Sequence, residues 1–328
     1  MKELLLLLCR YPYDKKNRET LSKLISEVTD WRKTVELINA HGIIALATYN
    51  IKEAGLVKKI PGDAMAFLEN GNMQSMVRNA WLTERWKEVN TILCDAGIKH
   101  IILKGMALEH TIYGSRGLRQ MNDNDILIKH EESYKAWQLL QQKGFTIEPL
   151  KSPLFKKIMF DLGKHLPTLY KNGFAIEIHH KLFDRGVKYD RSSFDFFEDA
   201  VEIKISGINA LILSREVQIM YLINHFEHHV AEGDCQLRLF NDIILLDKNR
   251  KIEFPDCFIS DPKQSHKPEF RKAAYKANLS LMPKWQRPLY ILGDTFPSVE
   301  WMKKRYNCNW LKLLIFYPVR ISKLLWLI

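Results

Sequence analysis

The stretch Arg119–Ile128, RQMNDNDILI, decides the fold class because it joins two acidic residues to a short apolar run. The run Asp125–Ile128 predicts a buried strand. Asp123 and Asp125 are two residues apart, so in an extended chain both carboxylates project from one side, about 7 Å apart. Two like charges this close repel each other unless cations neutralise them. The pair therefore predicts a site for Mg²⁺ (or Mn²⁺) and for the phosphates of a nucleotide.

Outward from this stretch, short apolar runs alternate with helical patterns. The further strands expected before residue 150 are Ile98–Lys104 and Phe145–Ile147, with a helix over Glu132–Gln142 between them. Asn172-Gly173 lies between two extended runs and predicts a hairpin. The pattern predicts an α+β fold, a mixed sheet with flanking helices.

Helical periodicity surrounds this sheet on both sides and predicts three regions, 1–96, 97–210 and 211–328. In the first region, apolar residues recur at three- and four-residue steps and predict a helix: Met73, Met76, Val77, Ala80, Val89, Ile92 and Leu93. In the last region, Ser214 is a plausible cap for a helix, and a second helix is expected over Leu237–Leu246. The final twenty residues predict an amphipathic segment broken at Pro318.

The predicted hairpin offers a third carboxylate. In FAIEIHH, residues 174–180, Phe174 and Ile176 share one face with Ile178, whereas Glu177 and His179 lie on the other. Next to the Asp125 strand, Glu177 would complete a three-carboxylate set and accept the proton of an attacking hydroxyl. The alternative is an ordinary surface residue, because antiparallel strands often turn one face to water.

Phosphate binding needs backbone donors and a cation. Lys104 and Gly105 lie where a strand leads into a helix, an arrangement that favours anions, and Arg119 is a second candidate cation. Gly114-Ser115 is a rival glycine motif, with seven residues between it and Asp123, although a simple loop over Gly114–Gly117 is the alternative interpretation.

These motifs together resemble the uncharacterised nucleotidyltransferase family of the polymerase-beta-like nucleotidyltransferase superfamily. The Lys-Gly and Arg-x-x-x-Asp-x-Asp patterns are also similar to abortive-infection nucleotidyltransferase toxins. The resemblance implies that Asp123, Asp125 and Glu177 bind Mg²⁺ and activate an acceptor hydroxyl, which attacks the α-phosphate of an NTP. The acceptor would be a small molecule, RNA or protein, and Lys104, Gly105 and Arg119 would bind the nucleotide. The competing hypothesis is a catalytically inactive nucleotide-binding or interaction module that acts through its basic C-terminal region.

Two other patterns have simpler explanations. His225 and His229 lie one helical turn apart, but no HExxH arrangement or third ligand accompanies them, so packing or substrate contact is favoured over a metal. Arg238 and Asp242, four residues apart, predict an ordinary salt bridge on one helix.

Composition limits the remaining classes. The five cysteines form no CxxC pair, and a reduced, cytoplasmic protein is the simplest expectation. No apolar run reaches the roughly 18 residues of a membrane span, and the short one at Leu4–Cys9 predicts a buried helix rather than a signal peptide. The net charge of +11 is concentrated in residues 251–328, which hold 14 Lys/Arg against 6 Asp/Glu. That region predicts attraction to nucleic acid or an anionic membrane surface, or simply a solvated basic face.

Overall fold

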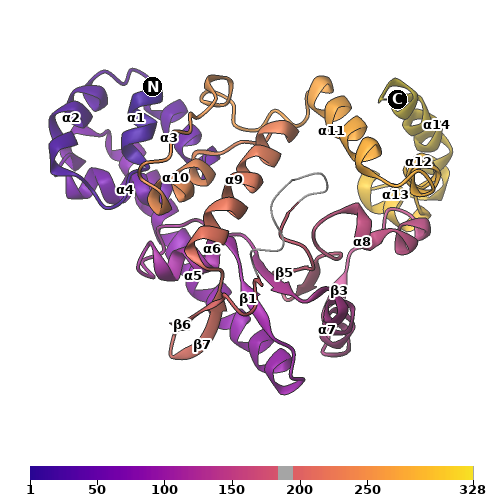
Figure 1. The fold of residues 1–328 in the computed structure, drawn as a ribbon. Helices are drawn as coiled ribbons and strands as arrows, with labels where there is room; N and C mark the ends of the chain where they lie inside the picture. Colours follow the sequence, from indigo (N-terminus) through magenta and orange to yellow (C-terminus); the bar gives the residue numbers. More distant parts are fainter. Residues whose placement is uncertain (184–194, 328) are drawn as a thin grey trace. The chain divides into compact units, whose positions relative to one another are not determined.

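The computed structural model describes residues 1–183 and 195–327 (Figure 1). Their contacts divide the chain into two compact units. Unit 1 holds Met1–Thr91, Ile101–Asp125 and Ser192–His266, and unit 2 holds Ile92–His100, Ile126–Arg191 and Lys267–Ile328. The units thus alternate along the sequence, whereas the regions 1–96, 97–210 and 211–328 are consecutive and stay a prediction of domain organisation.

Seven strands form one mixed sheet in the order β3-β4-β5-β2-β1-β7-β6. The strands are β1 (His100–Ile102), β2 (Asn124–Ile128), β3 (Thr146–Ile147), β4 (Leu169–Lys171), β5 (Phe174–His179), β6 (Val201–Ile205) and β7 (Ile208–Ile212). β1 pairs parallel to β7, whereas the β3–β4, β4–β5 and β6–β7 pairs are antiparallel. The predicted α+β class with flanking helices is confirmed.

Both hairpins of the sheet turn through residues with positive φ. Asn172 and Gly173 have φ values of 50° and 81°, and they join Lys171 to its partner Phe174, so the predicted Asn-Gly hairpin is confirmed. The β6–β7 hairpin was not predicted, although Ser206 and Gly207 adopt the same kind of turn, with φ values of 50° and 83°. A Ser-Gly pair between two alternating runs was the available signal.

Helices make up most of the remaining chain. Unit 1 holds α1 (Lys2–Leu8), α2 (Arg18–Ser26), α3 (Trp31–Ala40), α4 (Ile44–Glu53), most of α5 (Gly62–Asp95), α6 (Lys104–Thr111), α9 (Arg215–Glu232) and α10 (Leu237–Leu246). Unit 2 holds α7 (His130–Gln142), α8 (Met159–Leu162), α11 (Pro268–Leu281), α12 (Gln286–Thr295), α13 (Val299–Tyr306) and α14 (Trp310–Leu327). The short 3₁₀ turns are Lys15–Asn17, Val57–Lys59, Pro153–Lys157 and Asp256–Phe258. The expected helices at the start of the chain and over Leu237–Leu246 are confirmed.

The helix predicted from this apolar pattern is confirmed as α5, but the pattern coincides with buried side chains only in the second half of the helix. Val89 and Leu93 are fully buried, but Met73 is 58% exposed and Val77 61%. In this part of α5, small and polar side chains such as Ser75 and Asn79 are buried instead, because they bond to the backbone of another segment. Buried polar side chains leave no apolar periodicity in the sequence, so the sequence pattern could not reveal this contact surface of α5.

The predicted break at Pro318 is wrong. Pro318 lies inside α14, which continues through it. Pro318 is exposed, so a carbonyl group left without its helical partner there can be solvated. None of the helices in the part of the chain that the structure describes is long and apolar enough to cross a membrane.

Two glycines on the loop after α6 test how closely α5 approaches it. Gly117 (φ 73°) would place a Cβ 2.6 Å from Met76 Cα, whereas at Gly114 (φ 69°) the nearest atom would be Tyr11 Oη at 3.8 Å. Gly114→Ala should lose about 1–2 kcal/mol of unfolding free energy through backbone strain alone. Gly117→Ala should lose about 1–3 kcal/mol more, since α5 must move. Urea unfolding measures both, and equal losses would contradict the close approach of α5.

Candidate active site

A buried ion pair in unit 1 fixes the segment that leads into β2. The Arg119 Nε atom lies 2.9 Å from both carboxylate oxygens of Asp242 on α10, and Nη2 lies 2.7 Å from Oδ2. Arg119 is 5% exposed and Asp242 1%. Burial, the largest single influence, lowers the pKa of Arg119, but the charge of Asp242 and the hydrogen bond to it, together with the nearby Tyr113 and Asp123, leave the pKa raised. This pairing favours a positioning role for Arg119 over the predicted phosphate contact.

Two neighbours complete this pair. The Tyr113 hydroxyl donates to Asp242 Oδ1 (2.9 Å) and accepts from Asn241 Nδ2 (3.2 Å), while burial, together with the Asp242 charge, raises the pKa of Tyr113 well above its usual range. The salt bridge predicted between Asp242 and Arg238 is wrong in its cation, because Asp242 pairs with Arg119. Arg238 instead donates through Nη1 to the Gln120 carbonyl at 3.1 Å.

Glu109 on α6 holds the same loop through its backbone. Its two carboxylate oxygens accept from the backbone N–H groups of Gly117 and Arg119. Burial raises the pKa of Glu109, although these two hydrogen bonds act in the opposite direction. Glu109 thus fixes the loop at two positions, at Gly117 and at Arg119, which forms the ion pair.

Helix α5 holds the loop from another side. Ser75 Oγ donates to the Gly117 carbonyl (2.7 Å), Asn79 Nδ2 donates to that of Arg119 (2.9 Å) and Arg78 donates to that of Asn122 (2.7 Å). The backbone is therefore fixed from Gly117 to the residue before Asp123.

The two predicted metal ligands in this segment have different surroundings. β2 begins at Asn124, so Asp123 precedes the strand and is exposed, whereas Asp125 is 4% exposed. The Lys104 ammonium lies 2.7 Å from Asp125 Oδ1, and the Leu103 N–H donates to the Asp125 carbonyl at 2.9 Å. A buried carboxylate needs a compensating charge, and Lys104 supplies one.

Gly105 and the rival glycine motif lie in different environments. A Cβ at Gly105, in the first turn of α6, would lie 2.9 Å from Met121 Cγ, so a larger residue here would require the Met121 side chain to move. Gly114 and Ser115 form a turn with positive φ after α6, and Ser115 Oγ lies 2.7 Å from His110 Nδ1. The close approach of phosphate to either glycine motif stays a prediction.

In unit 2, Glu177 lies half-buried on β5 among three polar side chains. Thr168 Oγ1 donates to Glu177 Oε1 at 3.1 Å. His165 Nε2 and His179 Nε2 lie 3.6 and 3.7 Å from Oε2. His179 is 1% exposed, and it faces His165 across a β-bridge. These partners disfavour the alternative of an ordinary surface residue.

His180 directly follows β5 and belongs to a separate contact. Its Nδ1 lies 3.3 Å from His130 Nδ1, and its ring packs edge-on against Phe160. Burial, followed by the charge of Lys181, lowers the pKa of His180 to about 3. His180 is therefore neutral at physiological pH, which suits its packing against His130 and Phe160.

The paired histidines of α9 pack against each other in unit 1. The rings of His225 and His229 are 4.5 Å apart and perpendicular, and His229 Nδ1 lies 3.0 Å from the Asp234 carbonyl. Neither belongs to a group of three metal-ligand side chains among the described residues. Burial lowers the pKa of His229, which accords with the packing interpretation.

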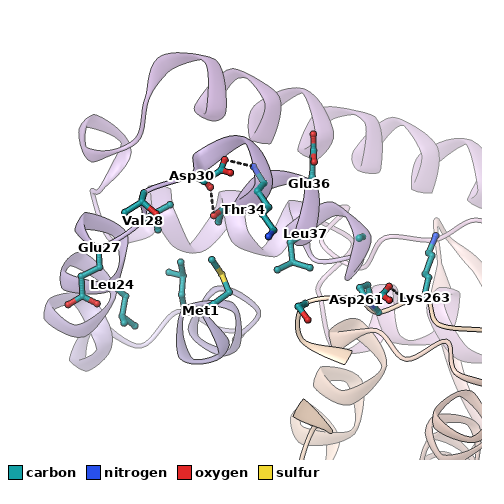
Figure 2. Close-up of a pocket in the computed structure, with 16 residues that line it drawn as sticks. Met1, Leu24, Glu27, Val28, Asp30, Thr34, Glu36, Leu37, Asp261 and Lys263 are labelled. Carbon is teal, nitrogen blue, oxygen red and sulfur yellow. Dashed lines mark hydrogen bonds between the residues drawn. The ribbon is translucent and has the colours of Figure 1, made fainter. Parts of the chain in front are cut away.

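A separate cavity of about 850 Å³ lies in unit 1 between the first helices and residues 260–263 (Figure 2). Its lining includes none of the predicted site residues. One of its carboxylates, Asp30, caps α3 by accepting from the Lys33 N–H at 2.9 Å (Figure 2). This acidic group therefore has a structural role.

Comparison with known proteins identifies the family of the chain. The chain matches the family described as uncharacterised nucleotidyltransferase over residues 27–277. That range covers most of the chain, including both units' predicted site residues, and the chain belongs to this family. No curated protein and no solved structure gives a significant match.

The buried ion pair predicts a large loss of stability when one partner is neutralised. Asp242→Asn leaves Arg119 as a buried cation without its counter-charge and should cost about 3–5 kcal/mol of unfolding free energy. Glu36→Gln is the matched control, because Glu36 forms an exposed pair with Arg32 at 3.4 Å and should cost less than about 1 kcal/mol. Chemical denaturation measures both. Similar small losses would show that the pair does not hold the loop.

Proposed function

We propose that the protein transfers a nucleoside monophosphate from a nucleoside triphosphate to a hydroxyl acceptor and releases pyrophosphate. Family membership supports this class of reaction. The observation that carries the proposal is the placement of carboxylates on two strands that are neighbours in the sheet, Asp125 on β2 and Glu177 on β5. Strand-borne side chains have little freedom, which suits a site that must hold reacting groups in a fixed geometry.

The side chains fit a divalent cation. Asp125, Glu177 and His179 are a set that could together hold a metal ion, and exposed Asp123 offers a further carboxylate. Carboxylate oxygens suit Mg²⁺, and the imidazole makes Mn²⁺ equally suitable. Such an ion would supply charge stabilisation at the α-phosphate and the pyrophosphate oxygens. His179 thereby joins the predicted ligands.

Lys104 has two anionic partners in this proposal. Its ammonium compensates Asp125, which is buried. With a metal ion held by the Asp125 carboxylate, that carboxylate would no longer need a second cation, and the Lys104 ammonium would pair with the triphosphate instead. The backbone N–H groups at the start of α6, including that of Gly105, favour the same anion.

Glu177 acts as the base in this proposal. It accepts the proton of the acceptor hydroxyl, whose oxygen forms the new bond to the α-phosphorus as the bond to pyrophosphate breaks. Thr168 holds Oε1 by a hydrogen bond, and the two imidazoles lie near Oε2. The acceptor is a hydroxyl of a small molecule, RNA or protein.

Label transfer tests the proposed activity. The full chain is incubated with each α-³²P-labelled NTP, Mg²⁺ or Mn²⁺ and cell extract, and labelled products are separated. Wild-type protein should transfer label from at least one nucleotide. Glu177→Gln should reduce the rate about 10²–10⁴-fold through loss of the base, and Glu36→Gln should leave it unchanged. Nucleotide binding without any transfer, unaffected by Glu177→Gln and Asp125→Asn, would instead favour the inactive binding module.

Metal binding is a second, activity-independent readout. Mn²⁺ titration followed by electron paramagnetic resonance should show binding by the wild type that weakens at least about tenfold in Glu177→Gln, since a ligand is lost. Glu177→Gln leaves the Lys104–Asp125 pair intact, so a folding defect is not expected. Unchanged Mn²⁺ affinity in this variant would remove Glu177 from the metal site.

A further inference from the structure

Helix α14 has two faces of different chemistry. Its inner face packs within unit 2: Leu313 is 4% exposed, and the Arg320 guanidinium donates to the Asp294 carbonyl at 2.9 Å and to its carboxylate at 3.0 Å. The Tyr317 hydroxyl donates to the Pro297 carbonyl at 2.6 Å. These contacts fix the rotation of the helix about its axis.

The fixed rotation turns a set of apolar side chains outward. Trp310 is 66% exposed, Leu311 75%, Leu314 76%, Ile315 64% and Val319 38%. Their spacing of one, four, five and nine residues from Trp310 places them on one side of a helix. Exposed Pro318 lies on the same side. A contiguous apolar face of this kind marks an interaction surface rather than an ordinary solvated helix.

Positive charge borders one end and one edge of this face. Residues 301–328 hold six Lys or Arg and no Asp or Glu. Lys312 is exposed at the edge of the face, and Lys304 and Arg305 are exposed on α13 just before it. The Lys303 ammonium lies 4.0 Å from the ring centroid of Trp310, so one end of the face joins an aromatic ring to a cation.

We propose that this face of α14, defined by Trp310, Leu311, Leu314, Ile315 and Val319, docks the protein on an anionic lipid surface. An apolar face bordered by lysine and arginine, with tryptophan at its margin, matches the boundary between acyl chains and negatively charged headgroups. Nucleic acid would use the cations but has no counterpart for four exposed aliphatic side chains, because its affinity comes from phosphates and base stacking. The helix lies along the surface and does not cross it.

Vesicle sedimentation tests the proposal with the full chain. Wild-type protein should bind vesicles of phosphatidylcholine with phosphatidylserine, bind vesicles of phosphatidylcholine alone more weakly, and lose affinity as salt rises. Leu311→Glu/Leu314→Glu should weaken binding to the anionic vesicles at least about tenfold, since two buried apolar contacts are lost and two negative charges are added.

The control is a matched pair on a different helix. Met73 and Val77 are also apolar and 58% and 61% exposed, on α5, so Met73→Glu/Val77→Glu makes the same chemical change outside the proposed surface and should leave vesicle binding unaltered. Thermal unfolding midpoints of all variants confirm folding. Lys312→Glu should weaken binding without removing any apolar contact.

Four results would overturn the proposal. They are absence of vesicle binding by the wild type, equal binding by wild type and Leu311→Glu/Leu314→Glu, binding to RNA or DNA but not to vesicles, and self-association that the same double variant abolishes while vesicles do not bind. The last would identify the face as an interface between copies of this chain.

Discussion

The buried Arg119–Asp242 ion pair is the constraint on which the site in unit 1 depends. Arg119 lies on the loop after α6 and Asp242 lies on α10, so the pair joins segments far apart in the sequence. Glu109 holds the backbone of the same loop from α6, and α5 holds it through Ser75 and Asn79. The loop therefore enters β2 in one conformation, which places Asp125 beside Lys104. A charged group this deeply buried is costly unless fully paired, and Asp242 together with its Tyr113 contact provides that pairing.

Local sequence was sufficient for the parts of the fold that local chemistry controls. The β-branched run before Lys104, the DILI strand and the Asn172-Gly173 turn each contain their own signal, and the structure has all three elements. The turn also fixes which residues of the two strands lie opposite each other, although this register was not predicted. Counting back from Lys171 and Phe174 places Thr168 opposite Glu177, where it donates a hydrogen bond. The same counting would place His165 opposite His180, but the observed bridge joins His165 to His179. A one-residue offset of this kind is a property of the folded sheet.

Long-range polar partners were not predictable in the same way. Arg119 was predicted to contact phosphate because it is a cation close to the predicted metal ligands in the sequence. Nothing near Arg119 in the sequence indicated Asp242 as its partner. The helical spacing of Arg238 and Asp242 predicted a local salt bridge. In the folded protein, Asp242 is buried beside Tyr113 and pairs with Arg119 instead. The first half of α5 was also unpredictable, because its buried face contains the polar residues Ser75 and Asn79. They bind backbone groups of another segment, and such contacts leave no apolar periodicity in the sequence. At Gly105, the close neighbour found in the structure is Met121.

We propose that Asp125 and Glu177 form the metal and nucleotide site. A crystal structure with Mn²⁺ and a non-hydrolysable NTP analogue tests it most directly, because the anomalous signal of manganese locates the ion independently of the chain. We expect manganese on the Asp125 and Glu177 carboxylates, with the triphosphate at Lys104 and the start of α6. Manganese and nucleotide bound away from both carboxylates, or a triphosphate held at Gly114-Ser115, would contradict it.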